Sequence, residues 1–238
     1  MQIDLTDEQR LLRDTCREFA ARELIPNAKK WDHAHTFPAE AVKKCAELGL
    51  FAVAVPEEWG GAGMDNVAYA LAIEEISRGC ASTGVTLSVS NSLYCDPVNK
   101  YGTPEQKERF LKPFARGDKL GCFGLTEPNA GSDAAEQRTT AVRKGDVYVL
   151  NGTKNWITNG PVADAIVLFT ITDPTKGVKG ITAFLVDTAH PGFVRQKADE
   201  KLGICASPSC TLFFENMEVP VSQRLGQEGE GFKIAMST

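Results

Sequence analysis

The first half of the chain carries apolar residues at helical spacing. One face of a helix would carry Leu12, Cys16, Phe19 and Ala20, which are separated by steps of four, three and one residues. The helix is expected to begin after Thr6-Asp-Glu-Gln, a capping-box pattern in which the threonine hydroxyl accepts from a backbone N–H and the glutamine side chain reaches back. The pattern therefore predicts an amphipathic helix close to the N-terminus.

Further helices are predicted before residue 118. Pro38 opens one of them, since proline suits the first turn of a helix. The stretch "VAYALAIEEISRGCAS" is apolar enough to form one largely buried helix. A second capping box, from Thr103 to Gln106, opens "EQKERFLKPFARG".

The apolar pattern changes to that of strands after residue 118. The stretch "DVYVLNGTKNWITNG" holds two short apolar runs around Asn151 and Gly152, a pair that suits a type I′ hairpin because both residues tolerate positive φ. The runs "DAIVLFTIT", "GITAFLVD", "GFVRQKAD" and "CTLFFENMEV" are rich in β-branched and aromatic residues and are broken by Gly, Pro or Asp. We expect each of them to be a strand.

Helices followed by strands predict two segregated units and not alternating βαβ units. We therefore expect an α+β chain, with an all-helical N-terminal domain over 1–118 and a β-sandwich or β-barrel middle domain over 119–228. The final stretch "GQEGEGFKIAMST" indicates a loop that runs into a helix. Because natural domains rarely end on a half-built apolar turn, we expect 229–238 to be the start of a truncated C-terminal helical domain.

Composition and charge narrow the class of protein. The chain has 238 residues, of which 42% are hydrophobic and 24% charged, and this is ordinary globular composition. A net charge of −5 argues against nucleic-acid binding, which needs a positive patch. No apolar run approaches the roughly 18 residues of a membrane helix, and "MQIDLTDEQRLL" lacks the features of signal and transit peptides. We expect no membrane span and a cytoplasmic location, with the mitochondrial matrix after processing as the alternative.

Cysteine and histidine usage predicts neither disulfides nor a metal site. The seven cysteines are odd in number and form no CxxC pair, which favours reduced thiols. His33 and His35 have no Cys or carboxylate at zinc-like spacing, so we interpret them as part of a polar turn. The glycines of "PEEWGGAGMDN" do not complete a dinucleotide-binding motif, because position 66 is Asn66, and we interpret them as a connection between helices.

One stretch, "FGLTEPNAGSDAAEQ", is unusual for the middle of a globular protein. Two acids, Glu127 and Asp133, each follow a hydroxyl residue, Thr126 or Ser132. Turn-favouring residues lie between them. The residues alone leave two interpretations open, a surface turn or a loop that holds a ligand.

The stretches "GLTEPNAGSD" and "NGTKNWITNG" together resemble the acyl-CoA dehydrogenase family. So do "PEEWGGAGMD", "ISRGCASTGV", "KLGICASPSCTLFFENMEVP" and "GEGFKIAM", and these motifs occur in family order across essentially the whole chain. "EEISRGCASTGV" and "SVSNSLY" are most similar to short-chain, butyryl-CoA-type members. The resemblance implies a helical N-terminal domain, a β middle domain and a C-terminal four-helix domain that this sequence does not contain, with FAD held between the last two.

The resemblance also implies which residues face the flavin and the substrate. In a first segment, the Thr126 hydroxyl and amide would bond the pyrimidine side of the ring, and Ser132 would lie near the pantetheine arm of the substrate. In a second segment, Trp156 would cover one ring face and the Thr158 hydroxyl would reach toward N5. The full cofactor-binding set is Phe123, Gly124, Leu125, Thr126, Glu127, Pro128, Asn129, Ala130, Gly131, Ser132, Trp156, Ile157 and Thr158.

These residue types suit a flavin, a flat aromatic with a polar edge. Tryptophan offers a stacking wall, and threonine hydroxyls and loop amides offer fixed donors. Each residue alone also has an ordinary structural explanation, since Trp156 could be a core residue and Glu127 could orient a turn. The matching order of the motifs favours the flavin interpretation.

The implied activity is FAD-dependent α,β-dehydrogenation of a short-chain acyl-CoA, as in fatty acid β-oxidation, with electrons passed to an electron-transfer flavoprotein. Relatives form homotetramers. In short-chain members the catalytic base lies in the C-terminal domain, so we assign no catalytic residue here, and Glu127 is not given that role. The alternatives are a non-catalytic flavin- or partner-binding fragment, and an acyl-CoA oxidase or flavin monooxygenase on the same fold. Two departures are Cys205, where relatives commonly have a basic residue, and Glu136, where they have a small one.

Overall fold

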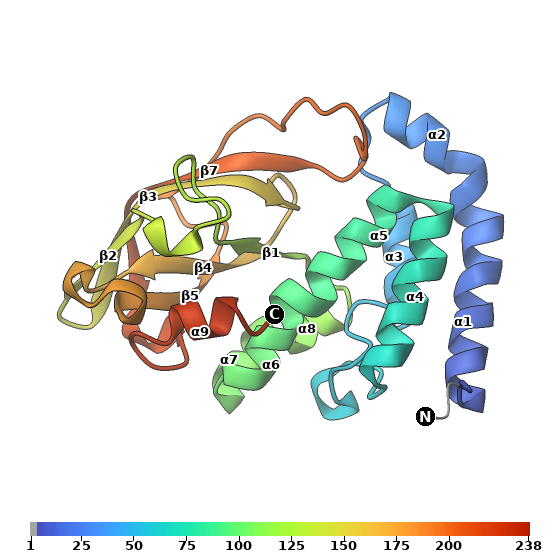
Figure 1. Cartoon of the computed structure of the whole chain (residues 1–238), viewed down its shortest axis with the longest axis horizontal. Helices are drawn as coiled ribbons and strands as arrows, with labels where there is room; N and C mark the ends of the chain where they lie inside the picture. The colour runs from blue at the N-terminus through green and yellow to red at the C-terminus, as the bar shows by residue number, and fades with distance from the viewer. Residues whose placement is uncertain (1–3) are drawn as a thin grey trace.

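The computed structural model describes residues 4–238 as a helical unit beside a strand unit (Figure 1). In chain order the α-helices are α1 (Asp7–Phe19), α2 (Ile25–His33), α3 (Ala39–Glu47), α4 (Asn66–Gly79), α5 (Ala81–Ser88), α6 (Asp96–Tyr101), α7 (Pro104–Phe110), α8 (Lys112–Ala115) and α9 (Gly231–Ala235). Two π-helical segments, Ala20–Leu24 and Val89–Cys95, join α1 to α2 and α5 to α6. Within the described part of the chain, no helix combines the length and the apolar character that crossing a membrane requires.

Both predicted capping boxes are confirmed. The Gln9 backbone N–H donates to Thr6 Oγ1 at 3.2 Å, and the Thr6 N–H donates back to Gln9 Oε1 at 3.0 Å. The same reciprocal pair joins Thr103 and Gln106 at the start of α7. These caps satisfy helix N–H groups that have no partner inside the helix, so the starts of α1 and α7 are fixed by local sequence.

The prediction of one continuous helix after the glycine-rich connection is wrong. The helix ends at Gly79, Cys80 is extended, and α5 starts at the next residue. A Cβ on Gly84 would lie 2.0 Å from Ser77 Oγ, so α5 packs back very closely against the end of α4. The break at Cys80 allows this close approach, which helical periodicity alone does not reveal.

In the described residues, 4–238, eight strands form one mixed sheet. They are β1 (Gly121–Gly124), β2 (Thr140–Lys144), β3 (Val147–Thr158), β4 (Ala165–Ile171), β5 (Ile181–Asp187), β6 (Phe193–Arg195), β7 (Ser209–Pro220) and β8 (Arg224–Leu225). The order along the sheet is β6-β7-β3-β2-β4-β5-β8, and β1 pairs with β4 in parallel. The sheet curves so that β3 and β7 lie over β1, β4 and β5 (Figure 1), with apolar side chains from both layers in one core. The strand expected in "GFVRQKAD" covers only the three residues of β6.

The predicted hairpin at Asn151 and Gly152 is wrong, because β3 runs without interruption through both residues. The tight turn lies earlier, at Gly145 and its neighbour, where β2 turns into β3. Gly152 instead lies at a register shift between β3 and β7, and a Cβ there would meet Thr139 Oγ1 at 2.5 Å. Glycine is therefore required for close packing at a bulge and not for a turn.

Strands β4 and β5 are buried on both faces, which explains their unbroken apolar runs. Ile166 and Phe184 face the interior between the two layers of the sheet. Val167 and Leu185 face the other way and share one core cluster with Phe110 and other residues of the helical unit. This shared core places β1, the neighbour of β4, at the boundary between the helices and the sheet.

Candidate functional site

The two segments singled out by sequence lie side by side at this boundary. The chain leaves β1 at Gly124 and passes the end of β3 as Leu125 and Thr126. The Asn155 backbone N–H donates to the Thr126 carbonyl at 2.8 Å, and Lys154 Nζ donates to the Leu125 carbonyl at 3.0 Å. Residues about 30 positions apart in sequence are thus held together by direct hydrogen bonds.

A cleft of about 250 Å³ opens where the segments meet. Its walls are Val89, Leu93, Phe123, Leu125, Thr126, Trp156, Ile157 and Thr158. Six of these eight residues belong to the set that the family resemblance assigned. Sequence reasoning missed Val89 and Leu93, which lie in the π-helical segment between α5 and α6. They face the cleft only because this segment packs against β1, and no local signal reveals such a contact.

Trp156 has an unusual conformation for a large aromatic residue. Its side chain is 60% exposed, and its φ of 58° lies in the left-handed region. The register between β3 and β7 shifts between Lys154 and Ile157, so Asn155 and Trp156 together oppose one residue of β7. Such a bulge re-aims a side chain, and a bulky residue held at positive φ costs about 1–3 kcal/mol. The fold therefore holds Trp156 outward, at the edge of the cleft.

The cleft combines apolar walls with free hydroxyls. Among residues 4–238, no side chain or backbone group forms a hydrogen bond with the hydroxyl of Thr126 or Thr158. Both side chains are only partly buried and face the cleft. Apolar and aromatic walls with a few polar groups are typical of sites for small molecules and cofactors. The donor set fits a flat aromatic ligand with a polar edge, such as a flavin ring. At about 250 Å³ the cleft is smaller than the roughly 300–1,000 Å³ that ligand sites usually enclose, so it would hold only part of a dinucleotide.

The Glu127 carboxylate points into the protein and not into the cleft. It accepts from the backbone N–H of Arg138 at 2.6 Å, from that of Thr139 at 3.0 Å and from Lys154 Nζ at 2.7 Å. Its backbone pairs with that of Ala130 across a tight turn. Burial opposes ionisation, but the Lys154 ammonium and the hydrogen bonds outweigh it and lower the pKa of Glu127. The carboxylate is therefore fully engaged as an anion.

The other assigned residues lie around the turn and do not line the cleft. Pro128, Asn129, Gly131 and Ser132 are exposed. Gly124 is required for packing, because a Cβ there would lie 2.7 Å from a methyl carbon of Ile166.

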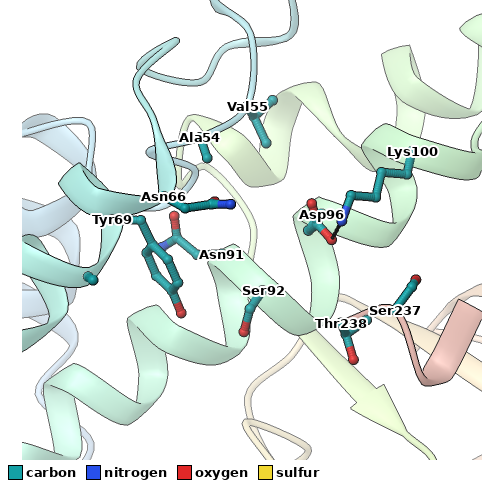
Figure 2. Close-up of a pocket in the computed structure, with 11 residues that line it drawn as sticks. Ala54, Val55, Asn66, Tyr69, Asn91, Ser92, Asp96, Lys100, Ser237 and Thr238 are labelled. Carbon is teal, nitrogen blue, oxygen red and sulfur yellow. Dashed lines mark hydrogen bonds and ion pairs between the residues drawn. The ribbon is translucent and has the colours of Figure 1, made fainter. Parts of the chain in front are cut away.

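A second cavity, of about 390 Å³, lies between α4, α6 and the C-terminal residues (Figure 2). Its polar side chains are largely engaged with the protein. The Asn91 amide accepts from Val53 N–H and donates to two backbone carbonyls, and Asp96 pairs with Lys100 at 2.7 Å. Ser237 and Thr238 form part of the wall. None of its lining residues belongs to the set that the family resemblance assigned to the cofactor or the substrate.

Neither the thiols nor the metal-binding residue types add a reactive group. All seven cysteines are buried and free. Burial raises the pKa of Cys16 and of Cys45 to about 12, so these thiols stay protonated. In the described range, no three His, Cys, Asp or Glu side chains are grouped as a metal ion would require.

The two departures from the family pattern lie outside the cleft. The Cys205 backbone N–H donates to Asp32 Oδ1 at 2.7 Å, which ties the β6–β7 connection to α2. The Cys205 thiol donates to the Lys201 carbonyl. Glu136 is exposed at the end of a short 3-10 turn.

Two family models match the chain. The model described as "Acyl-CoA dehydrogenase, N-terminal domain" matches residues 6–118, and "Acyl-CoA dehydrogenase, middle domain" matches residues 122–217. The two matches fall on the helical unit and on the strand unit.

Named relatives are similar over the whole chain. The short-chain specific acyl-CoA dehydrogenase of mitochondria from Rattus norvegicus is 52% identical over 236 residues, which are 99% of this chain and 57% of that protein. Butyryl-CoA dehydrogenase from Megasphaera elsdenii has a similar structure, with a TM-score of 0.96 and 42% identity over 99% of this chain and 63% of that one. A glutaryl-CoA dehydrogenase from Mycobacterium smegmatis in complex with FADH2 has a TM-score of 0.91 and 38% identity, over 98% of this chain and 58% of that one. The chain spans less than two thirds of the length of each.

Proposed function

We propose that this chain, which belongs to the acyl-CoA dehydrogenase family, supplies the flavin-facing walls of an enzyme. That enzyme would remove two hydrogens from a short-chain acyl-CoA. The observation that carries the proposal is the cleft whose walls include a strained, outward-held Trp156 and the free hydroxyls of Thr126 and Thr158. The names of the rat and Megasphaera relatives, short-chain specific and butyryl-CoA dehydrogenase, support the substrate class.

We propose FAD as the cofactor of this site. Bound FAD would supply the hydride acceptor, and the protein would supply position and electrostatics. Trp156 would cover one ring face, Phe123 and Leu125 would keep the site apolar, and the hydroxyls of Thr126 and Thr158 would donate to the polar edge of the ring. FADH2 in the glutaryl-CoA dehydrogenase complex supports the cofactor class.

The α-proton would be removed by a group outside this set of walls. None of the eight residues that line the cleft carries a carboxylate or an imidazole. A general base needs to lie within about 2.6–3.2 Å of its proton or one water away, and the Glu127 carboxylate faces the interior. We place the base in the part of the family's length that this chain does not span, and we assign no catalytic residue within residues 4–238.

The remaining proposals rest on family membership. We propose that residues 1–118 and 119–228 are the N-terminal and middle domains, and that 229–238 open a further helical domain. Ser132, exposed near the cleft segments, would contact the pantetheine arm of acyl-CoA. An electron-transfer flavoprotein would accept the electrons of a homotetrameric enzyme. The location would be the cytoplasm of a bacterium, with the mitochondrial matrix as the alternative, since the name of the rat relative describes that protein as mitochondrial.

Flavin binding tests the proposal directly. FAD is titrated into the chain and followed by flavin fluorescence, with Trp156→Ala, Thr158→Ala and the control Val142→Ala, which truncates an exposed valine of β2. Loss of stacking should cost about 1 kcal/mol in Trp156→Ala, a roughly fivefold rise in Kd. Thr158→Ala should shift the visible spectrum of the bound flavin, and Val142→Ala should change neither quantity. Equal Kd values and spectra in all four proteins would contradict the proposed site.

A further inference from the structure

Behind the cleft lies an ion pair buried on both sides. Lys154 Nζ and Glu127 Oε1 are 2.7 Å apart, and the two side chains are 0% and 6% exposed. In every other ion pair within residues 4–238, at least one partner is markedly exposed to solvent. Removing two charges from water is costly, and apolar residues of similar volume often stabilise a core as well or better. Packing alone therefore gives no reason for charges at this position.

The pair is fully satisfied in its hydrogen bonds. The ammonium has three hydrogens, and three acceptors face it: the Leu125 carbonyl at 3.0 Å, Glu127 Oε1 at 2.7 Å and Gln137 Oε1 at 3.1 Å. The carboxylate accepts in turn from the Arg138 and Thr139 backbone N–H groups. A complete network of this kind fixes one arrangement of its members, because any shift leaves a buried polar group without a partner.

The members come from three segments of the chain. Leu125 and Glu127 flank Thr126 in the cleft wall. Lys154 lies two residues before Trp156, on the inner side of the bulge. Gln137, which is 2% exposed, comes from the connection before β2. The bonds of Lys154 to Leu125 and Glu127 thus set the position of one cleft segment against the other, and Gln137 holds the lysine from behind.

We propose that the cluster of Lys154, Glu127 and Gln137 is a positioning device that sets the distance between the Thr126 wall and the Trp156 wall of the flavin cleft. This inference rests on the proposed flavin function for its ligand. The three are positioning residues, since their polar groups bond protein atoms and not the cleft. Sites of this kind need their walls held to within about 0.5 Å by supporting contacts.

The test distinguishes an effect on the position of the cleft walls from an effect on the folding stability of the chain. The variants are Lys154→Met, Glu127→Gln and the milder Gln137→Leu, which removes a neutral acceptor and leaves the ion pair in place. The control is Glu75→Gln, which alters a carboxylate that is also buried, at 3% exposure, but lies in α4 and bonds Arg17 and Arg78. Circular dichroism confirms that each protein is folded at the working temperature.

Two readouts are taken for each folded variant. The first is the emission of Trp156 without flavin, isolated by subtracting the spectrum of the matching Trp156→Phe protein. The second is the Kd for FAD from fluorescence titration. We expect Lys154→Met and Glu127→Gln to shift the Trp156 emission and to raise Kd roughly tenfold, with a smaller change in the same direction for Gln137→Leu. Glu75→Gln should leave the Trp156 emission unchanged and the Kd for FAD within about twofold of the parent value. It should nevertheless lower the unfolding midpoint.

The outcomes distinguish this inference from the proposed function. Unchanged Trp156 emission and unchanged Kd in folded Glu127→Gln and Gln137→Leu would overturn the positioning role, whether or not FAD binds to the parent chain. Emission shifts in these variants, together with a parent chain that binds no FAD, would support the positioning role and count against the flavin function. A loss of affinity in Glu75→Gln equal to that in Glu127→Gln would also overturn the inference, since it would mean that altering any buried carboxylate has this effect.

Discussion

Two buried carboxylates in this molecule are stabilised in different ways. Glu75 in the helical unit accepts from Arg17 Nε at 3.1 Å and from Arg78 Nε at 3.2 Å, and both arginine side chains are about half exposed. Hydrogen bonding to Arg17 is the main cause of its lowered pKa. Glu127 is bound to Lys154, which is wholly buried. The cations of Glu75 thus remain in water, whereas the cation of Glu127 does not.

The difference indicates two roles for the same residue type. At Glu75 the flexible arginines can adjust, so the pair joins α1 to α4 without demanding one geometry. At Glu127 both charges depend entirely on protein partners for hydrogen bonds, so the surrounding segments must hold their places. A pair of the second kind lies directly behind the cleft, where exact placement of Trp156 and Thr126 matters to a bound ring.

The largest expected difference between the two sites is in stability. Lys154→Met leaves a buried carboxylate without its cation, and this should lower the free energy of unfolding by about 3–5 kcal/mol. Arg17→Met removes the matching cation from Glu75, but Arg78 and solvent remain, so the loss should be clearly smaller. Urea unfolding followed by circular dichroism measures both. Equal losses in the two variants would mean that burial of the cation makes no difference.

Alkaline pH should sharpen the comparison between Glu127 and Glu75, because Lys154 titrates between about pH 8 and 10.5 and Arg17 does not. Burial lowers the pKa of Lys154 to about 8 from the ordinary 10.5, and Glu127, the charged group that faces it, limits the drop. Between about pH 8 and 10.5 the unfolded chain therefore binds more protons at this site than the folded chain, so this lysine's contribution to the free energy of unfolding rises with pH. The pKa of Arg17 is raised by its hydrogen bond to Glu75, so Arg17 stays charged.

The measurement is the unfolding free energy of the parent chain minus that of each variant, at several pH values. The difference from Lys154→Met should grow as pH rises from about 8 toward 10, and the difference from Arg17→Met should stay flat. A flat difference for Lys154→Met would mean that the lysine titrates at its ordinary pKa in the folded chain, and a falling difference would mean that its pKa is raised there; either result contradicts the prediction.

Features that depend on a few neighbouring residues could be predicted from the sequence. The capping boxes at Thr6 and Thr103 follow from side chains three positions apart, and strand β4 follows from an unbroken apolar run. The hairpin prediction failed because Asn-Gly marks a turn only when nothing else needs the glycine. Here Gly152 is needed for close contact with Thr139, on a different segment.

The cleft could be predicted in part, and only through resemblance. Spacing and composition did not distinguish a ligand loop from a surface turn, and six cleft residues came from family motifs. Val89 and Leu93 could not be found, because their place depends on how a π-helical segment packs against β1. The inward direction of Lys154 and the outward direction of Trp156 depend on a bulge whose partner strand lies about 55 residues further on.

The most direct test of the flavin cleft uses the three tryptophans, Trp31, Trp59 and Trp156. Each gives one indole N–H signal in a ¹H–¹⁵N NMR spectrum, and Trp156→Phe identifies the signal of Trp156. We predict that addition of FAD moves the Trp156 signal strongly, through the ring current of a flavin stacked on it, while the signals of Trp31 and Trp59 in the helical unit stay in place. If the Trp156 signal stays fixed while FAD binds, or if either of the other two moves in its place, the cleft beside Trp156 is not the flavin site.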